Sequence, residues 1–557
     1  MIIEFGRENK EGEIVVYQKK PWLKFYDPRI SKDVSIEYDS LFDLLKQAAN
    51  IHNDKPALTF FGKLWSYKET RMISEWLAAS LFRVGLKKGD RMAIMLPNCP
   101  HYILSLFAAF RLGGIAVQVN PMYVEREIEY VLNDSGAEYM VVFEALYPRV
   151  KKVQPKTSLK KVIVVGFTGN RIQLDDGDLY FEDFLTHDNV IPDIPIDIHE
   201  DVAILQYTGG TTGVSKGVML THHNLLANII QVCDFTYNAV DEKPEHFKIV
   251  SVLPMFHVYG LSCNALSAIR IGCNQLILPR FDVNEVLDLI KREKPFQMTA
   301  VPTMIFALNS HPHLEESSIG DIFYLNSGGA PLPVEQVKAF EKRVGTRLSD
   351  GYGLSETAPS AISTPPFLPR KLGSVGIPLP GTEARIVEET PSGIVDVSVG
   401  EAGELILRGP QVMKGYWKRP GDTEMVLKDG WLFTGDIAKM DEDGYFYILD
   451  RKNDIIIASG YNVYPREIEE VLYQHEAVEE AIVIGVPDTY RGETVKAFVK
   501  LKPGEAITPE KLIEFAKVNL APYKVPKEIE ILDELPKSSV GKLLRRMLRK
   551  EQEKTQV

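Results

Sequence analysis

A loop rich in glycine, threonine and serine carries the strongest chemical signal in the sequence. It follows an apolar run that ends at Tyr207, and it continues to Gly217. Glycines let backbone N–H groups approach a ligand closely, hydroxyl groups add donors, and a lysine adds positive charge. This combination predicts a polyphosphate-binding loop rather than a plain surface loop. Its candidate residues are Thr208, Gly209, Gly210, Thr211, Thr212, Gly213, Ser215 and Lys216.

Two other motifs, the Walker A loop and the nucleophile elbow, are alternatives for the same stretch. A Walker A loop requires G-x-x-x-x-G-K-[ST], and no register of the stretch supplies it. The residues from Gly213 to Gly217 do satisfy G-x-S-x-G, the nucleophile elbow of α/β-hydrolases. That elbow places its serine directly after a strand, whereas seven residues separate Tyr207 from Ser215. A serine hydrolase with Ser215 as nucleophile is therefore a disfavoured alternative that stays open.

Strand and helix patterns alternate around this loop. We expect strands over 91–97, 115–119, 139–143 and 247–254, and helices over 101–113, 125–136 and 281–295. Such alternation predicts parallel sheets covered by helices. Between 373 and 449 the pattern changes to strands punctuated by Gly and Pro, which indicates a smaller β-rich unit. After residue 450, helical runs at 465–476 and 508–520 alternate with strand runs, which is typical of a compact α+β domain.

Length and composition exclude several classes of protein. The 557 residues exceed what one core usually holds, so we expect two or more folded units. The net charge of −12 argues against a nucleic-acid partner. Four cysteines without metal-ligand spacing indicate buried thiols in a reducing compartment. The N-terminus shows no signal peptide, and Arg111 interrupts the best membrane-span candidate, 102–119, so we expect a soluble cytoplasmic protein. Peripheral membrane contact and a homodimer stay open.

Seven motifs follow one another in a fixed order along nearly the whole chain. They are YTGGTTGVSKG (207–217), LPMFHVYG (253–260), NSGGAPLP (326–333), GYGLSETAP (351–359), GWLFTGD (430–436), DRKNDIIIASGYNVYPREIE (450–469) and PKSSVGK (536–542). In this order they resemble the acyl-adenylate-forming superfamily, which includes acyl-CoA synthetases, luciferases and peptide-synthetase adenylation domains. The run 430–469 is most similar to bacterial and archaeal long-chain fatty acid–CoA ligases.

The resemblance implies a reaction in two steps. A carboxylate attacks the α-phosphorus of ATP to give acyl-AMP and pyrophosphate, and the thiol of CoA then displaces AMP. ATP and CoA are thus the expected co-substrates and Mg²⁺ the expected cofactor. Glu356 would hold the metal with help from the hydroxyl of Thr208, which suits a cation that prefers oxygen ligands. Ser355 stands where the family usually has Thr and keeps the hydroxyl.

The resemblance also implies the nucleotide contacts. Tyr352 is the expected stacking platform for adenine, and Asp436 the expected acceptor of both ribose hydroxyls, with Arg451 nearby. A core tyrosine and a turn aspartate are the alternatives for the first two. Further residues of the predicted nucleotide site are Gly328, Gly329, Ala330, Asp350, Gly351, Gly353 and Ser355.

Four residues are the expected catalytic set: Lys542, Glu356, Lys216 and His257. On charge pattern alone the basic tail around Lys542 indicates a solvated face or a weak contact with an anionic surface. Its PKSSVGK frame instead resembles the lysine that bridges the substrate carboxylate and the α-phosphate. The resemblance places His257 at the mouth of the acyl pocket, whereas the residue type alone favours a core histidine.

The resemblance completes the predicted fold. It is an α/β protein, with a large N-terminal adenylation part (residues 1–450) of layered α/β subdomains plus a β-rich subdomain, and a small mobile α+β domain (residues 451–557). Ser459, Gly460 and Tyr461 are the expected CoA channel. Asp450 and Asn453 are the expected hinge. Related sequences usually carry Lys or Asp where this chain has Asn453. It therefore becomes doubtful that a charge at this residue stabilises either orientation of the mobile domain.

These patterns together predict an AMP-forming acyl-CoA ligase for a medium- to long-chain fatty acid. The segments 258–278 and 301–308 are apolar and suit an acyl tunnel, although they also suit a buried core. An aryl or short-chain acid ligase is the alternative within the class. From other classes, the serine hydrolase and an inactive nucleotide- or acyl-binding protein stay open.

Overall fold

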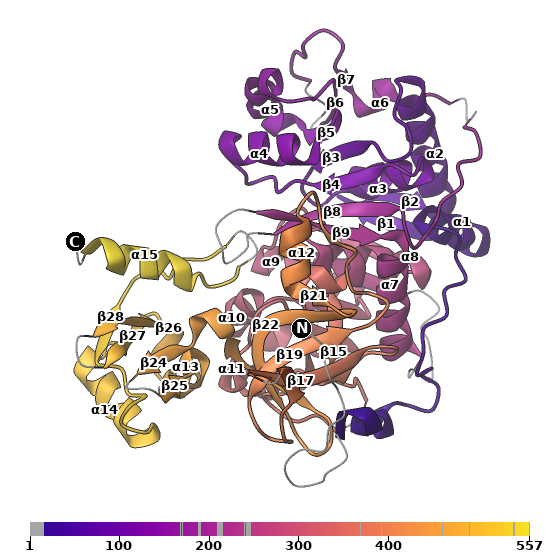
Figure 1. Ribbon diagram of the computed structural model, residues 1–557. Helices are drawn as coiled ribbons and strands as arrows, with labels where there is room; N and C mark the ends of the chain where they lie inside the picture. Colours follow the sequence, from indigo (N-terminus) through magenta and orange to yellow (C-terminus); the bar gives the residue numbers. More distant parts are fainter. Residues whose placement is uncertain are drawn as a thin grey trace.

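The computed structural model describes residues 16–167, 169, 171–187, 191–208, 215–238, 240, 247–367, 369–391, 393–458, 461–488, 491–538 and 541–555. Four sheets organise these residues. Figure 1 shows a large N-terminal part and, in yellow at the lower left, a smaller unit formed by the C-terminal residues.

The sheet that carries the glycine-rich loop has eight strands in the order β20-β9-β8-β4-β3-β5-β6-β7. Strands β8 to β7 in this order are parallel, and β9 and β20 add antiparallel pairs at one edge. Met92 and Ile94 of β3 face one core, and Ala93 and Met95 face another. The central strands are largely apolar because both faces of the sheet are covered. The strands are β3 (Arg91–Met95), β4 (Ile115–Gln118), β5 (Tyr139–Phe143), β6 (Lys161–Val165), β7 (Leu179–Tyr180), β8 (Val202–Thr208), β9 (Lys216–Thr221) and β20 (Gly415–Tyr416).

A second sheet has nine strands in the order β16-β15-β14-β13-β12-β10-β11-β1-β2. Its central strands are parallel, and antiparallel strands close both ends. This sheet supplies the two strands whose carboxyl ends carry the NSGGAPLP and GYGLSETAP motifs. The strands are β1 (Pro56–Phe60), β2 (Lys63–Ser66), β10 (Lys248–Ser251), β11 (Asn274–Ile277), β12 (Gln297–Ala300), β13 (Tyr324–Gly328), β14 (Leu348–Gly353), β15 (Ser360–Ser363) and β16 (Ile377–Pro378).

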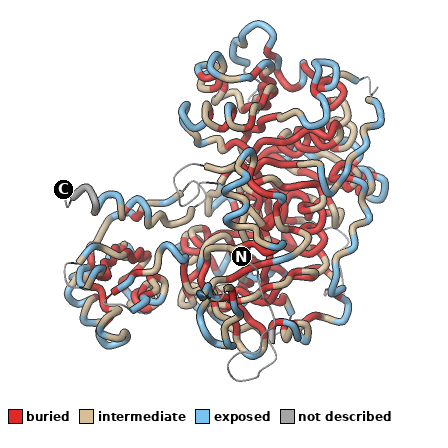
Figure 2. The backbone as a smooth tube through the Cα atoms, viewed as in Figure 1, coloured by how far each residue is buried: buried red, intermediate tan, exposed pale blue. Residues whose placement is uncertain are grey.

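Helices cover both faces of both sheets. Apolar residues of α1, α2, α3 and α7 share one core with the inner faces of the two sheets. Helices α9, α10 and α11 cover the outer face of the nine-stranded sheet. Helices α4 and α5 cover the outer face of the eight-stranded sheet. Figure 2 shows the resulting buried layers. These helices are α1 (Leu41–His52), α2 (Tyr67–Arg83), α3 (Pro100–Arg111), α4 (Glu125–Ser135), α5 (Tyr147–Val153), α6 (Phe181–Phe184), α7 (His222–Tyr237), α8 (Ser267–Arg270), α9 (Val283–Glu293), α10 (Pro302–Asn309), α11 (Val334–Val344) and α12 (Pro420–Val426).

The β-rich unit expected between 373 and 449 forms an antiparallel sheet. Its order is β18-β17-β19-β22-β21, and β23 pairs with β22. The pairing of β22 with β23 sets Asp436 opposite Arg451. The strands are β17 (Glu383–Thr390), β18 (Gly393–Asp396), β19 (Gly403–Arg408), β21 (Leu427–Lys428), β22 (Trp431–Met440) and β23 (Phe446–Arg451).

The C-terminal residues form the fourth sheet, with the order β25-β24-β27-β26 and β28 paired with β27. Residues of α13 and α14 pack on this sheet in a core of their own. The last strand of the β-rich sheet ends at Arg451, and the first strand of the C-terminal sheet begins at Ile456. The elements are β24 (Ile456–Ala458), β25 (Tyr461–Val463), α13 (Pro465–Tyr473), β26 (Val478–Asp488), β27 (Gly492–Leu501), α14 (Pro509–Asn519), β28 (Glu528–Ile531) and α15 (Arg545–Thr555).

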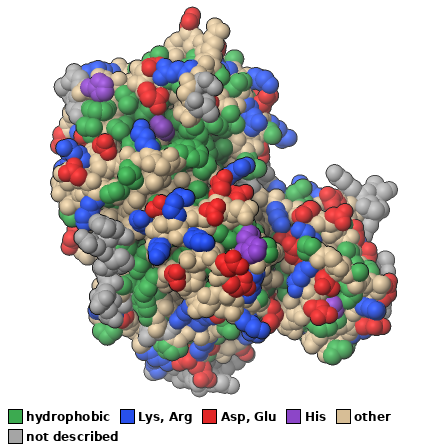
Figure 3. All heavy atoms as spheres, turned by 180° about the vertical axis from the view of Figure 1, so that it is seen from behind, with side chains coloured by type: hydrophobic (Ala, Val, Ile, Leu, Met, Phe, Trp, Pro, Cys, Tyr) green, Lys and Arg blue, Asp and Glu red, His purple; other side chains and the backbone are tan. Residues whose placement is uncertain are grey.

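The fold class predicted from the sequence is confirmed, as is the run of strands and helices on which it rested. All four cysteines are buried and free. The basic tail is a solvated face only in part: in its helix α15, Arg546 and Lys550 are exposed, whereas Leu548 is buried and Arg545 pairs with acidic residues. The candidate span at 102–119 contains the core helix α3, and no helix among the described residues is long and apolar enough to cross a membrane. Figure 3 shows acidic and basic side chains interspersed on the far face.

Candidate active site

The glycine-rich loop joins two antiparallel strands, β8 and β9, at the edge of the eight-stranded sheet. Thr208 is the last residue of β8 and lies opposite Lys216, the first residue of β9. The predicted phosphate-binding residues Gly209, Gly210, Thr211, Thr212 and Gly213 lie outside the described residues. Both ends of the loop are therefore fixed by the sheet ladder, which holds Thr208 and Lys216 side by side.

Ser215 does not have the environment of a hydrolase nucleophile. Its hydroxyl donates a hydrogen bond to the backbone carbonyl of Thr208 at 2.7 Å, and its own carbonyl accepts one from the Tyr130 hydroxyl at 2.7 Å. A nucleophilic serine gives its proton to a neighbouring base such as histidine. The hydroxyl of Ser215 instead makes a hydrogen bond to Thr208 across the base of the loop, which indicates a structural role.

Glu356 lies in a single 3-10 turn, Ser355–Thr357, that follows β14. Oε1 of Glu356 accepts a hydrogen bond from the Tyr416 hydroxyl at 2.8 Å, and its backbone carbonyl accepts one from the N–H of Met413 at 2.9 Å. Gly353, just before the turn, must be glycine because a Cβ there would lie 1.9 Å from the carbonyl oxygen of Pro359. The turn is thus held tightly enough to fix the direction of the carboxylate.

Lys216 is held by residues that sequence reasoning missed. Its ammonium pairs with Asp422 at 3.2 Å and lies 5.2 Å from the ring centre of Tyr416. Both partners belong to the segment 413–423, which adds β20 to the sheet beside β9. Nothing in that segment has the composition of a phosphate loop or a catalytic motif. The signal that could have found it is GYWKRPGDT, which combines aromatic, basic and acidic residues around a turn.

Tyr352 and Asp436 meet where the nine-stranded and β-rich sheets adjoin. The Tyr352 hydroxyl donates to one carboxylate oxygen of Asp436 at 2.5 Å, and Nε of Arg451 lies 3.1 Å from the other. Burial raises the pKa of Asp436, and the charge of Arg451 and the hydrogen bond from Tyr352 oppose that rise. Each carboxylate oxygen has further lone pairs, so Asp436 can also accept hydroxyl groups of a ligand.

Lys542 reaches this cluster from the C-terminal unit. Its Cε is the atom nearest to a Cβ built at Gly329, at 3.8 Å, and Gly329 itself has a φ of +81°. Burial, together with the charge of Arg451, lowers the pKa of Lys542 to about 8, and the charges of Asp436 and Glu356 partly oppose both effects. The structure therefore brings together Lys542, Glu356, Asp436 and Arg451, which are separated by up to 186 positions in the sequence.

His257 lies beside the same cluster. Its Nδ1 accepts a hydrogen bond from the backbone N–H of Tyr259 at 3.3 Å. Burial, together with the charge of Lys542, lowers the pKa of His257 to about 3, so the ring is neutral at neutral pH. The residues after it form a π-helix, Tyr259–Leu266, whose side chains reach the core between the two large sheets. A neutral ring at this place suits an apolar neighbour better than a charged one.

The remaining predicted nucleotide residues lie at the carboxyl ends of β13 and β14. Gly328 and Gly351 are paired there, and Gly328 is packed against Tyr259 so closely that a Cβ would lie 2.9 Å from the hydroxyl oxygen. Ala330 is half-buried just beyond. Asp350 faces the C-terminal unit instead: burial raises its pKa to about 7, and the charge of Arg466 opposes the rise.

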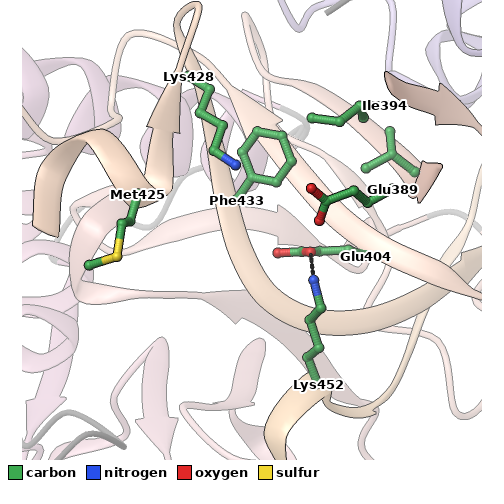
Figure 4. Close-up of a pocket in the computed structure, with 8 residues that line it drawn as sticks. Glu389, Ile394, Glu404, Met425, Lys428, Phe433 and Lys452 are labelled. Atoms are coloured by element: carbon green, nitrogen blue, oxygen red, sulfur yellow. Dashed lines mark hydrogen bonds and ion pairs between the residues drawn. The ribbon is translucent and has the colours of Figure 1, made fainter. Parts of the chain in front are cut away.

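The expected hinge is surrounded by charges, although Asn453 has none. Asp450 accepts hydrogen bonds from Arg545 at 2.9 Å and from the N–H of Arg466 at 2.9 Å. Lys452 pairs with Glu404 at 2.8 Å at the edge of a cavity of about 110 Å³ in the β-rich sheet (Figure 4). Of the expected CoA channel, Ser459 and Gly460 lie outside the described residues, and Tyr461 is exposed and stacks on Tyr523.

Comparison with known proteins places this geometry in a family. A model of the AMP-binding enzyme family matches residues 45–417, and a model of the AMP-binding enzyme C-terminal domain matches residues 467–542. The chain belongs to the AMP-binding enzyme family. The resemblance drawn from the motifs and the expectation of an acyl-adenylate-forming ligase are thereby confirmed.

The relatives of this AMP-binding enzyme include two bacterial proteins matched over almost their whole length. A long-chain-fatty-acid–CoA ligase of Bacillus subtilis is 43% identical over 96% of this chain and 98% of its own. A long-chain-fatty-acid–CoA ligase of Salmonella typhimurium is 41% identical over the same shares.

Among solved structures, ATP-bound MatB from Rhodopseudomonas palustris is 30% identical, with a TM-score of 0.83 over 92% of this chain and 99% of that one. The same enzyme without ATP has a TM-score of 0.75 over the same shares, at 29% identity. The arrangement of this AMP-binding enzyme is therefore closer to the ATP-bound form.

The lowered pKa of Lys542 is directly measurable. Because a buried ammonium loses its proton more readily, Lys542 should react with a lysine-selective acylating reagent half-maximally near pH 8, well below the value of about 10.4 for an ordinary lysine. Replacing Arg451 by Gln should raise that midpoint, since a neighbouring positive charge is removed. Mass-spectrometric peptide mapping across pH 6–11 reports the midpoint, and the exposed Lys517 in the same unit is the internal control. An unshifted Lys542 midpoint would show that its ammonium is solvated.

Proposed function

We propose that this AMP-binding enzyme is a long-chain fatty acid–CoA ligase. It would join a fatty acid to ATP as acyl-AMP, releasing pyrophosphate, and then transfer the acyl group to the thiol of CoA with release of AMP. The observation that carries the proposal is the approach of Lys542 from the C-terminal unit to a cluster that contains Glu356 and Asp436 beside the glycine-rich loop. The long-chain relatives support the choice of acid.

In the first step, positioning and charge neutralisation carry most of the catalysis, as in other transfers of phosphorus groups. Lys542 would draw the fatty-acid carboxylate and the α-phosphate together, since both are anionic. Lys216 would leave Asp422 for the outer phosphates. Asp436 would accept hydrogen bonds from the ribose hydroxyls while Tyr352 contacts the adenine. All of these groups lie in one cluster or at the ends of the glycine-rich loop.

The residues present also fit a magnesium ion. Glu356 offers a carboxylate that Tyr416 already orients, and the hydroxyl of Thr208 is an oxygen donor at the neck of the loop. Oxygen donors of this kind suit Mg²⁺, which usually binds through one or two carboxylates and the phosphates of the nucleotide. When bound, the ion would neutralise charge on the phosphates.

The acyl chain is proposed to enter along the segments that follow His257. The π-helix is flanked by Val258, and its residues Leu261, Ala265 and Leu266 face the core between the large sheets. Helix α10, from the second apolar segment, instead places Met304 and Phe306 in the core on the other face of the nine-stranded sheet. π-helical turns are frequent at functional sites because their backbone is locally wider than an α-helix. The neutral His257 would border this apolar path.

The second step is proposed to need a different pose of the C-terminal unit. Lys542 must face the phosphates in the first step, whereas the strand pair near Tyr461 must reach the thioester site in the second. Both belong to the unit 451–557, so one rigid pose cannot serve both tasks. A rotation at Asn453, directly after the anchored Lys452, would resolve the conflict.

Acid-dependent exchange of labelled pyrophosphate into ATP tests the function itself. The enzyme should catalyse this exchange with acids of long chain length and should form the matching acyl-CoA when CoA is added. A panel of short, medium, long and aryl acids, scored by exchange and by acyl-CoA formation, measures the preference. Best turnover with an aryl or short-chain acid would favour the alternative within the family. A lack of exchange with every acid would point to an inactive binding protein.

Lys542→Ala should separate the two half-reactions. The variant should lose pyrophosphate exchange by a factor of at least about 10², because one preorganised charge-stabilising group is typically worth 10²–10³ in rate. Conversion of supplied acyl-AMP to acyl-CoA should be largely spared, since that step has no encounter between carboxylate and phosphate. Lys537→Ala, which removes a nearby lysine paired with Glu480, is the matched control. Equal loss of both half-reactions in a folded variant would assign Lys542 another role.

Asn453→Pro should have the opposite selectivity. Proline fixes φ near −65° and so resists the backbone rotation expected at this residue. Pyrophosphate exchange should remain, because the present pose already brings Lys542 to the site, whereas thioester formation from acyl-AMP should fall strongly. Rapid-quench measurement of each half-reaction reports both rates. A variant that makes acyl-CoA from acyl-AMP at the wild-type rate would show that the pivot is elsewhere.

A further inference from the structure

Tyr416 contacts both of the charged groups proposed to face the polyphosphate. Its hydroxyl donates to Oε1 of Glu356 at 2.8 Å, and its ring centre lies 5.2 Å from the ammonium of Lys216. The tyrosine is 8% exposed. A single side chain thus connects the carboxylate that follows β14 in one large sheet with the lysine that opens β9 in the other.

The backbone around Tyr416 is fixed on each side. In the ladder between β20 and β9, Tyr416 lies opposite Val218. Its own N–H donates to the hydroxyl of Thr423 at 2.9 Å, and the N–H of Met413 donates to the carbonyl of Glu356 at 2.9 Å. The position of the phenol is therefore set relative to the two segments that carry Lys216 and Glu356.

The phenol contacts two opposite charges that do not pair with each other. Lys216 pairs with Asp422 rather than with Glu356, and the Tyr416 ring lies beside the ammonium. A direct pair between Lys216 and Glu356 would neutralise both groups and leave neither for the nucleotide.

We propose that Tyr416 is a positioning residue that orients the carboxylate of Glu356 toward a divalent cation and holds Lys216 away from it. The inference rests on the proposed ligase function, in which Glu356 binds Mg²⁺. A hydrogen bond to one oxygen of a carboxylate fixes its rotation and leaves the second oxygen for the metal. Partners of this kind typically change metal affinity or activity 10- to 100-fold when removed.

Tyr416→Phe tests the hydrogen bond alone, because it keeps the ring and deletes the hydroxyl. The Mg²⁺ concentration for half-maximal pyrophosphate exchange should rise about 10-fold or more. Binding of Mn²⁺, measured by electron paramagnetic resonance with a non-hydrolysable ATP analogue present, should weaken by a similar factor. Formation of acyl-CoA from supplied acyl-AMP should not change, since it uses neither polyphosphate nor metal.

Two further variants set the scale. Tyr416→Ala also removes the ring, so it should raise the KM for ATP in addition to the Mg²⁺ requirement, because Lys216 can then pair with Glu356. Tyr445→Phe makes the same chemical change at a hydroxyl that donates to the Pro369 carbonyl at 2.7 Å, and it should match the wild type in every assay.

The outcomes separate the inference from the proposed function. Wild-type Mn²⁺ binding and Mg²⁺ dependence in Tyr416→Phe would overturn the inference and leave the function standing. A loss of thioester formation equal to the loss of exchange would also overturn it, since it would mean a general structural role. If the wild type shows no acid-dependent exchange, the proposed function fails, and the Mn²⁺ measurement with the ATP analogue still decides whether Tyr416 orients Glu356.

Discussion

The architecture depends on placing a lysine ammonium, Lys542, inside a site built by other parts of the chain. Removing a charge from water is costly unless opposite charges face it. Asp436 and Glu356 supply those charges, but Arg451 and burial outweigh them, so the pKa falls to about 8. Bound anions would offset this imbalance. A carboxylate and an α-phosphate beside Lys542 would stabilise its protonated, positively charged form. The β-rich sheet supplies Asp436 and Arg451, and the turn after β14 of the nine-stranded sheet supplies Glu356.

The C-terminal unit meets that receptor through contacts that can be undone. Glu470 accepts a hydrogen bond from the Val334 N–H at 3.2 Å, and the rings of Phe306 and Tyr473 stack at 6.2 Å. Close to Asn453, Arg545 of the C-terminal unit pairs with Asp450 of the N-terminal part at 2.9 Å. Because Asn453 is neutral, a charged contact that holds the C-terminal unit was doubtful on the sequence alone. The structure has such a contact close to Asn453, between Arg545 and Asp450. Rotation at Asn453 would break the pair of Arg545 with Asp450 while keeping its pair with Glu469, which travels with it.

Much of the fold could be predicted from local sequence patterns, and the reason is physical. A buried parallel strand such as β5 is apolar at every position, so its ends, Tyr139 and Phe143, were predicted to the residue. The resemblance of the motifs to a known family indicated Glu356, Asp436 and Lys542. The sequence did not reveal pairings between distant segments, such as β1 with β11 or β20 with β9, because these depend on the whole fold. Tyr416 was missed for that reason: its role comes from its neighbours in space.

The two kinds of residue divide the site's work. Groups that contact the nucleotide in the proposed mechanism lie in glycine-rich or acidic motifs, since close backbone approach and charge restrict the residue types that can serve. Groups that hold them, such as Tyr416, Asp422 and Arg545, come from ordinary helices and strands, where many sequences could provide a hydroxyl or a charge. In the proposed cycle, in which the C-terminal unit approaches and leaves the site, these supports would keep Glu356 and Lys216 apart and aligned while Lys542 is absent. The hydrogen bond from Tyr416 to Glu356 and the pair of Lys216 with Asp422 both lie within the N-terminal part, so a rotation of the C-terminal unit would break neither of them. Only the phosphates of the nucleotide would draw Lys216 away from Asp422. Glu356, the proposed metal ligand, would thus keep its position while Lys542 approaches and leaves the site.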